Sequence, residues 1–237
     1  MGLSKTTMAH ILWRLLLIQG AWNFKGMQNI GFAYAMLPGL KEIHGDRAGE
    51  KAARYAGFFN THPYMAPTIA GVFLKLEEQG RAEEADKIKP ALCGSLAAMG
   101  DTFFWATLKP ITALLLLLAV LVDQLWGMAL VLLLYNGMHL WVMAWGFSRG
   151  YRDGPDGALA LGRMLSVDRI RHVALMVPLL AGMVLAFPAP WHPGGLVGLG
   201  ASVLVFLGAA VAYRLKLGVF RIFYGVFALA LIWTMIT

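Results

Sequence analysis

The feature that most constrains the fold is a run of 23 residues, Leu125–Phe147, without a single Asp, Glu, Lys or Arg. As a helix rising about 1.5 Å per residue, this run is long enough to cross the roughly 30 Å of hydrocarbon in a bilayer. Apolar segments of similar character follow at Val173–Phe187, Gly194–Ala212 and Val219–Ile236, while Ile111–Val122 is short for a span. The sequence therefore predicts an all-α, polytopic membrane protein with several C-terminal transmembrane helices.

Charge is unevenly distributed along the chain. Residues 1–109 contain 12 Lys and Arg and 9 Asp and Glu, whereas residues 110–237 contain 8 and 4. We therefore predict an amphipathic, re-entrant region over residues 1–110 and a transmembrane region over residues 111–237. The loop Arg149–Arg171 carries five arginines against three aspartates. Because basic loops stay in the cytoplasm, we expect a multi-pass protein of the cell (inner) membrane whose N-terminal half faces the cytoplasm.

The N-terminal half predicts interfacial and broken helices. The first helix mixes apolar residues with Lys5, His10 and Arg14, so it either lies along the membrane interface as an anchor or packs as an ordinary helix. Thr68–Leu76 and Ala91–Met99 are apolar, but each is too short to cross a bilayer as a helix. Because polar breaks flank both segments, we expect re-entrant or broken helical hairpins.

Local signals predict where several helices end. Met27–Lys41 is expected to be helical and to stop near Pro38-Gly39, because proline disrupts a helix interior. Gly100-Asp101 is expected to interrupt the helical segment before it. Glu77-Glu78 is expected to mark a helix end at the cytoplasmic surface, where it could dock a partner.

The stretch Phe58–Pro67 is the strongest candidate for a ligand site. It holds three adjacent polar side chains, Asn60, Thr61 and His62, between aromatic residues and two prolines. Pro63 biases His62 away from helical geometry, and Pro67 can begin a new helix. A polar break between apolar flanks is costly in a membrane protein unless it faces protein or water. This break is therefore a candidate ligand site.

Several linked motifs resemble the IID component of mannose-family sugar phosphotransferase systems. They are Met27–Pro38, Phe58–Tyr64 (Phe-Phe-Asn-Thr-His-Pro-Tyr), Leu76–Gly80, Gly100–Pro110 (Gly-Asp-Thr-Phe-Phe-Trp-Ala-Thr-Leu-Lys-Pro), and Asn136–His139 with Gly150–Arg152. The resemblance covers about residues 10–155, and the C-terminal spans share only its general character.

This resemblance implies a membrane subunit that pairs with a IIC subunit to form a hexose path, assembled as a trimer of IIC–IID heterodimers. Cytoplasmic IIA and IIB proteins carry phosphohistidines, and IIB phosphorylates the sugar during uptake. The chain itself would bind sugar without being phosphorylated, so phosphotransferase activity belongs to the complex. The alternative is a regulatory or receptor-like membrane protein that kept this scaffold and lost transport.

A hexose needs groups that both donate and accept hydrogen bonds, together with an aromatic wall. The candidate sugar contacts are Gln28, Asn60, Thr61, Asp101 and Trp105. Asn60 or Asp101 could instead cap a helix, and the two roles are compatible for Asp101. His62 is interpreted as a structural histidine, in preference to a phospho-acceptor or proton carrier.

The sequence holds no pattern typical of a catalytic nucleophile, a phosphate-binding glycine loop or a metal site. Its single cysteine, Cys93, excludes a disulfide within the chain. The net charge of +7 suits an anionic membrane leaflet better than nucleic acid, because the arginines lie beside apolar spans. We therefore expect no catalytic residue, cofactor, metal or nucleic-acid partner.

Overall fold

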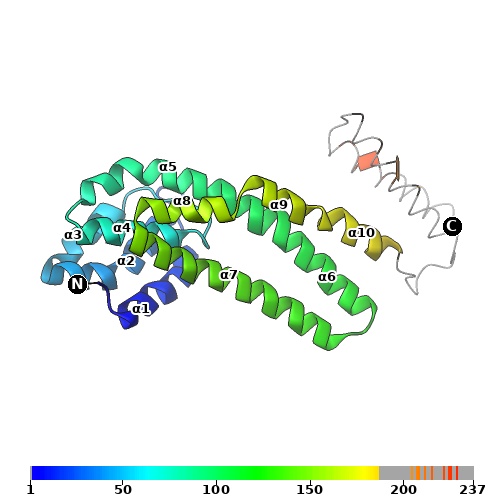
Figure 1. Cartoon of the computed structure of the whole chain (residues 1–237), viewed down its shortest axis with the longest axis horizontal. Coiled ribbons are helices and arrows are strands. Elements are labelled where there is room, and N and C mark those ends of the chain that lie inside the picture. Colours follow the sequence, from blue (N-terminus) through cyan, green and yellow to red (C-terminus); the bar gives the residue numbers. More distant parts are fainter. Residues whose placement is uncertain are drawn as a thin grey trace. The chain divides into compact units, whose positions relative to one another are not determined.

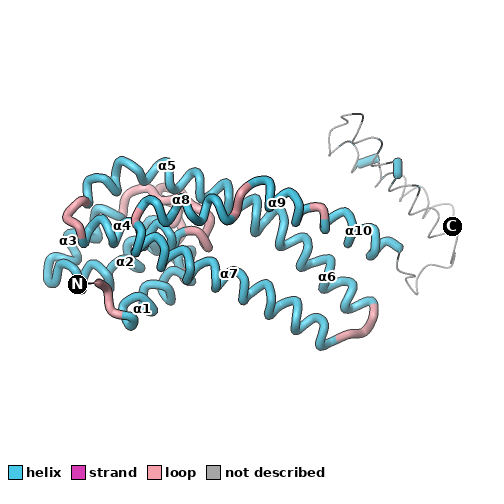
Figure 2. The backbone as a smooth tube through the Cα atoms, viewed as in Figure 1, coloured by secondary structure: helices cyan, strands magenta, loops and turns pink. Residues whose placement is uncertain are grey.

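All the secondary-structure elements in the described part of the chain are helices, which confirms the predicted all-α class (Figure 2). This computed structural model describes residues 2–186 and nine isolated positions between 204 and 228. The predicted spans Gly194–Ala212 and Val219–Ile236 therefore lie almost entirely outside the described residues.

The chain divides into two compact units. One comprises Met1–Thr112 and Ala129–Ala174, and the other comprises Ala113–Met128 and Leu175–Thr237. Residues 129–174 thus pack with the N-terminal half of the chain. The predicted division at residue 110, between an amphipathic and re-entrant region and a transmembrane region, stays a prediction. All the candidate site residues belong to the first unit.

The first unit begins with short helices. They are α1 (Lys5–Leu16), the 3-10 turn η1 (Ile18–Ala21), α2 (Asn29–His44), the 3-10 turn η2 (Gly45–Arg47) and α3 (Ala48–Tyr55). Helix α2 continues through Pro38, so the predicted stop at Pro38-Gly39 is wrong. A proline costs the helix one hydrogen bond, but α2 buries Phe32, Met36 and Leu40 completely, and this packing keeps the helix intact.

Helix α1 carries apolar residues on two sides. Its inner side buries Ile11 and Leu15, while Trp13 is 65% exposed and the adjoining Leu17 is 60% exposed. Ser4 caps the helix by accepting a hydrogen bond from the Thr7 N–H. The outer apolar side suits a membrane interface, and the anchoring role of this helix stays a prediction.

Helix α4 (Ala66–Glu78) forms the centre of the first unit and contacts α1, α2, α5 (Ala82–Gly100) and α8 (Pro155–Met164) (Figure 1). It begins next to Pro67, as predicted, and nearly all its side chains are buried. Its backbone also lies directly against α7 (Leu125–Asp153), since a Cβ added at Gly71 or Gly150 would collide with the backbone of the facing helix. Glycines four residues apart, Gly146 and Gly150, give α7 the small surface that such close helix packing needs.

The predicted interruption at Gly100-Asp101 is wrong. Helix α5 (Ala82–Gly100) continues through a π-helical segment, η3 (Asp101–Leu108), into α6 (Lys109–Leu121), as one helix of 40 residues. Within the π-helical segment, the Thr107 hydroxyl donates to the carbonyl of Thr102, five residues earlier, at 2.8 Å. The two polar residues therefore lie within a longer helix that changes its winding there.

Two helices in the described part are long and apolar enough to cross a membrane: Ala82–Leu121 and α7 (Leu125–Asp153). Only 22% and 17% of their most apolar windows are buried inside the protein, so most of these apolar side chains need another apolar environment. The remaining helices are α8 (Pro155–Met164), α9 (Val167–Ala174) and α10 (Met176–Ala186). The predicted re-entrant hairpins stay a prediction.

Candidate functional site

The Asn-Thr-His loop is held in place by two of the predicted site residues. The Gln28 side-chain amide donates to the Thr61 carbonyl at 2.8 Å and accepts from the Thr61 N–H at 3.1 Å. The Thr61 hydroxyl donates to the carbonyl of Cys93 on α5 at 3.2 Å. Gln28 and Thr61 are 2% and 4% exposed. Their side chains therefore fix the loop between α2 and α5, and the predicted contact of Gln28 and Thr61 with sugar stays a prediction.

His62 attaches the same loop to the π-helical segment. Its ring stacks on Phe104 with 5.2 Å between ring centroids, and it packs against Gly100, where a Cβ would overlap the imidazole. Nδ1 accepts a hydrogen bond from the Tyr64 N–H at 3.2 Å, which leaves the proton of the neutral ring on Nε2. Burial, followed by the nearby Lys109 ammonium, lowers the pKa of His62 to about 4. A buried, neutral ring agrees with the structural role expected for His62.

A pocket of about 510 Å³ opens between this loop and α5. Its lining residues are Phe58, Asn60, Asp86, Lys89, Pro90, Cys93, Gly94 and Ala97. The α5 residues form one stripe at helical spacing, and the small side chains of Gly94 and Ala97 leave room for a ligand. The pocket therefore combines an aromatic wall with polar groups, as a small polar ligand requires.

Asn60 lines this pocket. The residue is exposed, and its side chain makes no hydrogen bond with the described residues. Helix α4 begins only at Ala66, and no side chain caps it, so the alternative role of Asn60 as a helix cap is wrong. A free amide that can both donate and accept is the group a hydroxylated ligand would use.

Asp101 and Trp105 lie beyond the pocket on the same helix. Asp101 is exposed and lies inside a continuous helix, so the alternative role of Asp101 as an N-cap is wrong. It follows Ala97, a pocket residue, by one helical turn on the same face. Trp105 is 46% exposed, and the Lys109 Nζ lies 5.0 Å from its ring centroid. Neither residue lines the pocket itself, and their contact with sugar stays a prediction.

Sequence reasoning missed Phe58, Asp86 and Lys89 as pocket residues. Charged residues surround Asp86 and Lys89 in the sequence, a pattern typical of a solvated helix face. The signal that could have found them is the stripe of small residues that follows on the same face of the helix, at Gly94 and Ala97.

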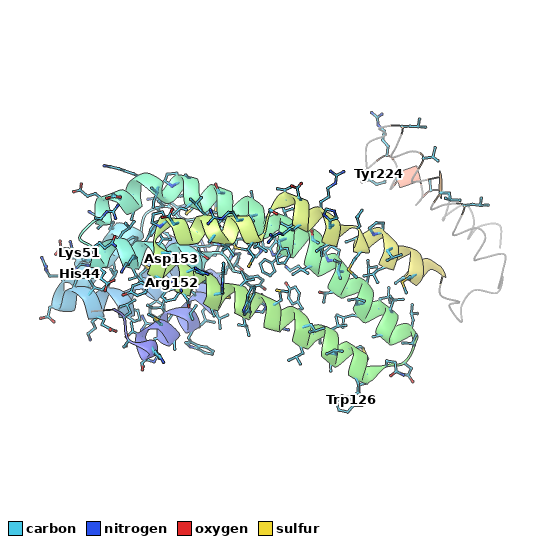
Figure 3. The ribbon with its side chains drawn as sticks, in the orientation of Figure 1. His44, Lys51, Trp126, Arg152, Asp153 and Tyr224 are labelled. Atoms are coloured by element: carbon cyan, nitrogen blue, oxygen red, sulfur yellow. The ribbon has the colours of Figure 1, made fainter. Side chains whose placement is uncertain are left out.

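The carboxylate of Glu77 does not lie at the surface. Only 2% of the residue is exposed, and the Tyr55 hydroxyl donates to its Oε1 at 2.7 Å. Its Oε2 lies 2.8 Å from Nε2 of His44, at the end of α2 (labelled in Figure 3). Burial and this carboxylate raise the pKa of the Tyr55 phenol, which stays protonated and donates. Helix α4 does end at Glu78, but the expectation that Glu77 is free to dock a partner is wrong.

Within the described residues, no group of three His, Cys, Asp or Glu side chains is arranged to hold a metal ion. The pocket at Asn60 carries polar groups from which a function can be argued. Its amide, carboxylate and ammonium groups suit hydrogen bonding to a neutral, hydroxylated ligand.

Comparison with known proteins decides the family. Residues 2–187 match the model of the PTS system mannose/fructose/sorbose family IID component. The chain belongs to this family. The motifs that resembled IID components in the sequence therefore identified the family correctly.

The IID chain has relatives in several bacteria. It is 36% identical over 164 residues to the PTS system mannose-specific EIID component of Escherichia coli (strain K12), covering 65% of this chain and 58% of that protein. It is 32% identical over 164 residues to the fructose permease IID component of Bacillus subtilis (strain 168), covering 65% and 59%. The IID chain thus spans less than two thirds of the length of these curated relatives.

Solved structures share the fold. One, described as a membrane protein, matches with a TM-score of 0.72 and 27% identity, covering 97% of the IID chain and 96% of the other. The cryo-EM structure of the mannose transporter ManYZ in complex with microcin E492 matches with a TM-score of 0.61 and 24% identity, covering 97% and 95%. At that identity, the second likeness concerns the fold alone. Family, fold and helix length together make this IID chain a helical membrane protein.

Proposed function

We propose that the chain is the membrane-embedded IID subunit of a phosphoenolpyruvate-dependent sugar phosphotransferase system. It forms the hexose path together with a IIC subunit, and cytoplasmic IIA and IIB proteins carry the phosphate. IIB phosphorylates the sugar during uptake, and the IID chain carries no phosphate. The family match supports this proposal, and the names of the mannose-specific and fructose relatives favour a hexose.

The observation that carries the sugar-binding part is the unpartnered Asn60 amide in its pocket. In this proposal Asn60 bonds the sugar hydroxyls, while Gln28 and Thr61 keep its loop in position. Asp101 lies one turn beyond the pocket and accepts from a hydroxyl at its rim. The half-exposed Trp105 supplies an apolar ring face on the same side of the path.

The proposed assembly is a trimer of IIC–IID heterodimers in the cell inner membrane. The chain is multi-pass, with its N-terminal half facing the cytoplasm. The excess of arginine in the segment Arg149–Arg171 supports this orientation, because basic segments beside membrane spans remain on the cytoplasmic side.

Uptake of labelled mannose and fructose tests the proposal, in cells that contain the IIA, IIB and IIC partners. Asn60→Ala and Asp101→Ala are expected to abolish uptake, with unchanged membrane levels and unchanged co-purification of IIC. Gln19→Ala removes an exposed amide away from the pocket and should leave uptake intact. Normal uptake by both the Asn60 and Asp101 variants would remove these residues from the site. The regulatory alternative predicts sugar binding without uptake, even in the unmodified protein.

A further inference from the structure

Two charged residues of α5 share the pocket with Asn60. Asp86 and Lys89 are three residues apart, so their side chains lie on neighbouring positions of one helix face. Other charged residues of this helix lie outside the pocket, so charge alone does not make a residue of α5 a ligand contact. Asp86 and Lys89 are candidate ligand contacts because their side chains leave hydrogen-bond acceptors and donors unused.

The Asp86 carboxylate keeps most of its capacity to accept hydrogen bonds. Its side chain is 53% exposed, and its one ion pair with a described residue, Arg54 through Nε, is long at 3.7 Å. A carboxylate offers about four acceptor positions. Pro90, which has no N–H, also leaves the main-chain carbonyl of Asp86 without its donor in the helix. This edge of the pocket is therefore rich in acceptors.

The Lys89 ammonium supplies donors beside these acceptors. Lys89 is half-buried, and its Nζ lies 5.9 Å from the Phe59 ring centroid. Within the described residues the ammonium makes no hydrogen bond and no ion pair, so its three N–H groups remain available. Donor and acceptor one turn apart match two adjacent hydroxyls of a sugar ring.

We infer that Asp86 and Lys89 recognise adjacent hydroxyls of the hexose in the Asn60 pocket and that Asp86 discriminates against the phosphorylated product. This inference rests on the proposed sugar-binding function. One hydroxyl donates to the Asp86 carboxylate, and its neighbour accepts from the Lys89 ammonium. Phe58, which is 60% exposed, provides the apolar wall for the ring. A phosphate brought to this pocket is attracted by the Lys89 ammonium and repelled by the Asp86 carboxylate, so the carboxylate reduces the advantage that the phosphorylated product would gain from the ammonium.

The test measures equilibrium binding of radiolabelled mannose and fructose, and of hexose 6-phosphate as competitor, to the purified IIC–IID complex in lipid nanodiscs. Lys89→Met should weaken binding of the sugar about ten- to a hundredfold, the loss typical of a hydrogen bond to a charged group. Asp86→Asn keeps an acceptor, so it should weaken sugar binding less than Lys89→Met does. It should also lower the ratio of the affinity for hexose to the affinity for hexose 6-phosphate. Lys89→Arg, which keeps the charge and the donors, should recover part of the affinity.

Matched controls are Lys87→Met and Glu83→Gln, exposed residues of the same helix that do not line the pocket. Both should bind sugar as the unmodified complex does. Sugar affinity and phosphate discrimination that are unchanged in the Lys89 and Asp86 variants would overturn this inference while leaving the proposed function standing. A failure of the unmodified complex to bind any of these sugars would overturn both.

Discussion

The buried contact between Tyr55 and Glu77 yields a direct test of what holds the first unit together. Tyr55 is 1% exposed, and its hydroxyl donates to Glu77 Oε1 at 2.7 Å, joining α3 to α4. Tyr55→Phe keeps the ring in place but leaves that oxygen without its donor inside the protein. The remaining partner of the carboxylate is His44, on the other oxygen.

The expected cost of Tyr55→Phe is about 2 kcal/mol, within the range for a hydrogen bond to a charged group. For a chain of this size about 1 kcal/mol shifts Tm by about 2–4 °C, so we expect Tm to fall by about 4–8 °C. The assay heats detergent-solubilised IIC–IID complex and follows the soluble fraction by fluorescence-detected size-exclusion chromatography.

Tyr34→Phe is the matched control, because Tyr34 is 51% exposed and its ring keeps the cation–π contact with Arg14. It should change Tm by less than about 2 °C, as surface substitutions usually do. A double-mutant cycle with Glu77→Gln should show that the two substitutions are not additive. If Tyr55→Phe has the same Tm as the unmodified protein, or if Tyr34→Phe lowers Tm by as much as Tyr55→Phe does, the buried hydrogen bond does not stabilise the first unit.

Two further predictions concern His62. Its pKa is about 4 in the folded protein, against an ordinary value near 6.5, so the unfolded chain binds more protons between these values. The free energy of unfolding should therefore fall by up to about 3 kcal/mol as pH drops from 6.5 to 4. His62→Gln should make this fall smaller. If Tm depends on pH in the same way in His62→Gln and in the unmodified protein, the prediction is contradicted. Gly100→Ala places a methyl group against the His62 ring and should cost about 1–3 kcal/mol by thermal unfolding. Gly94→Ala, whose Cβ meets nothing within 4 Å, should cost little, and equal losses in both variants would refute the contact.

Much of the helical framework could be predicted from local sequence. The 23 uncharged residues of Leu125–Phe147 predicted the long apolar part of α7, and Pro67 predicted the start of α4. These predictions succeeded because length, charge and a fixed backbone angle act within a few neighbouring residues. The motifs that identified the family are local in the same sense.

Predictions based on helix breakers failed where packing outweighed them. Pro38 lies inside α2, and Gly100-Asp101 lies within a continuous helix. Each breaker costs a helix at most a few kcal/mol, and the burial of neighbouring large side chains can offset that. At Gly100 the absence of a side chain serves packing, since it makes room for the His62 ring.

The sequence by itself determined the class of this protein, its family, and Asn60 as a polar residue that needed an explanation. Only the tertiary structure decided how these groups are used. It turned Gln28 and Thr61 inward to hold the loop, buried Glu77, and brought Asp86 and Lys89 to the pocket of Asn60. The physical reason is that hydrogen bonding and burial depend on which residues, distant in the chain, meet when Gln28 and α5 contact the loop and when α2 and α3 contact α4.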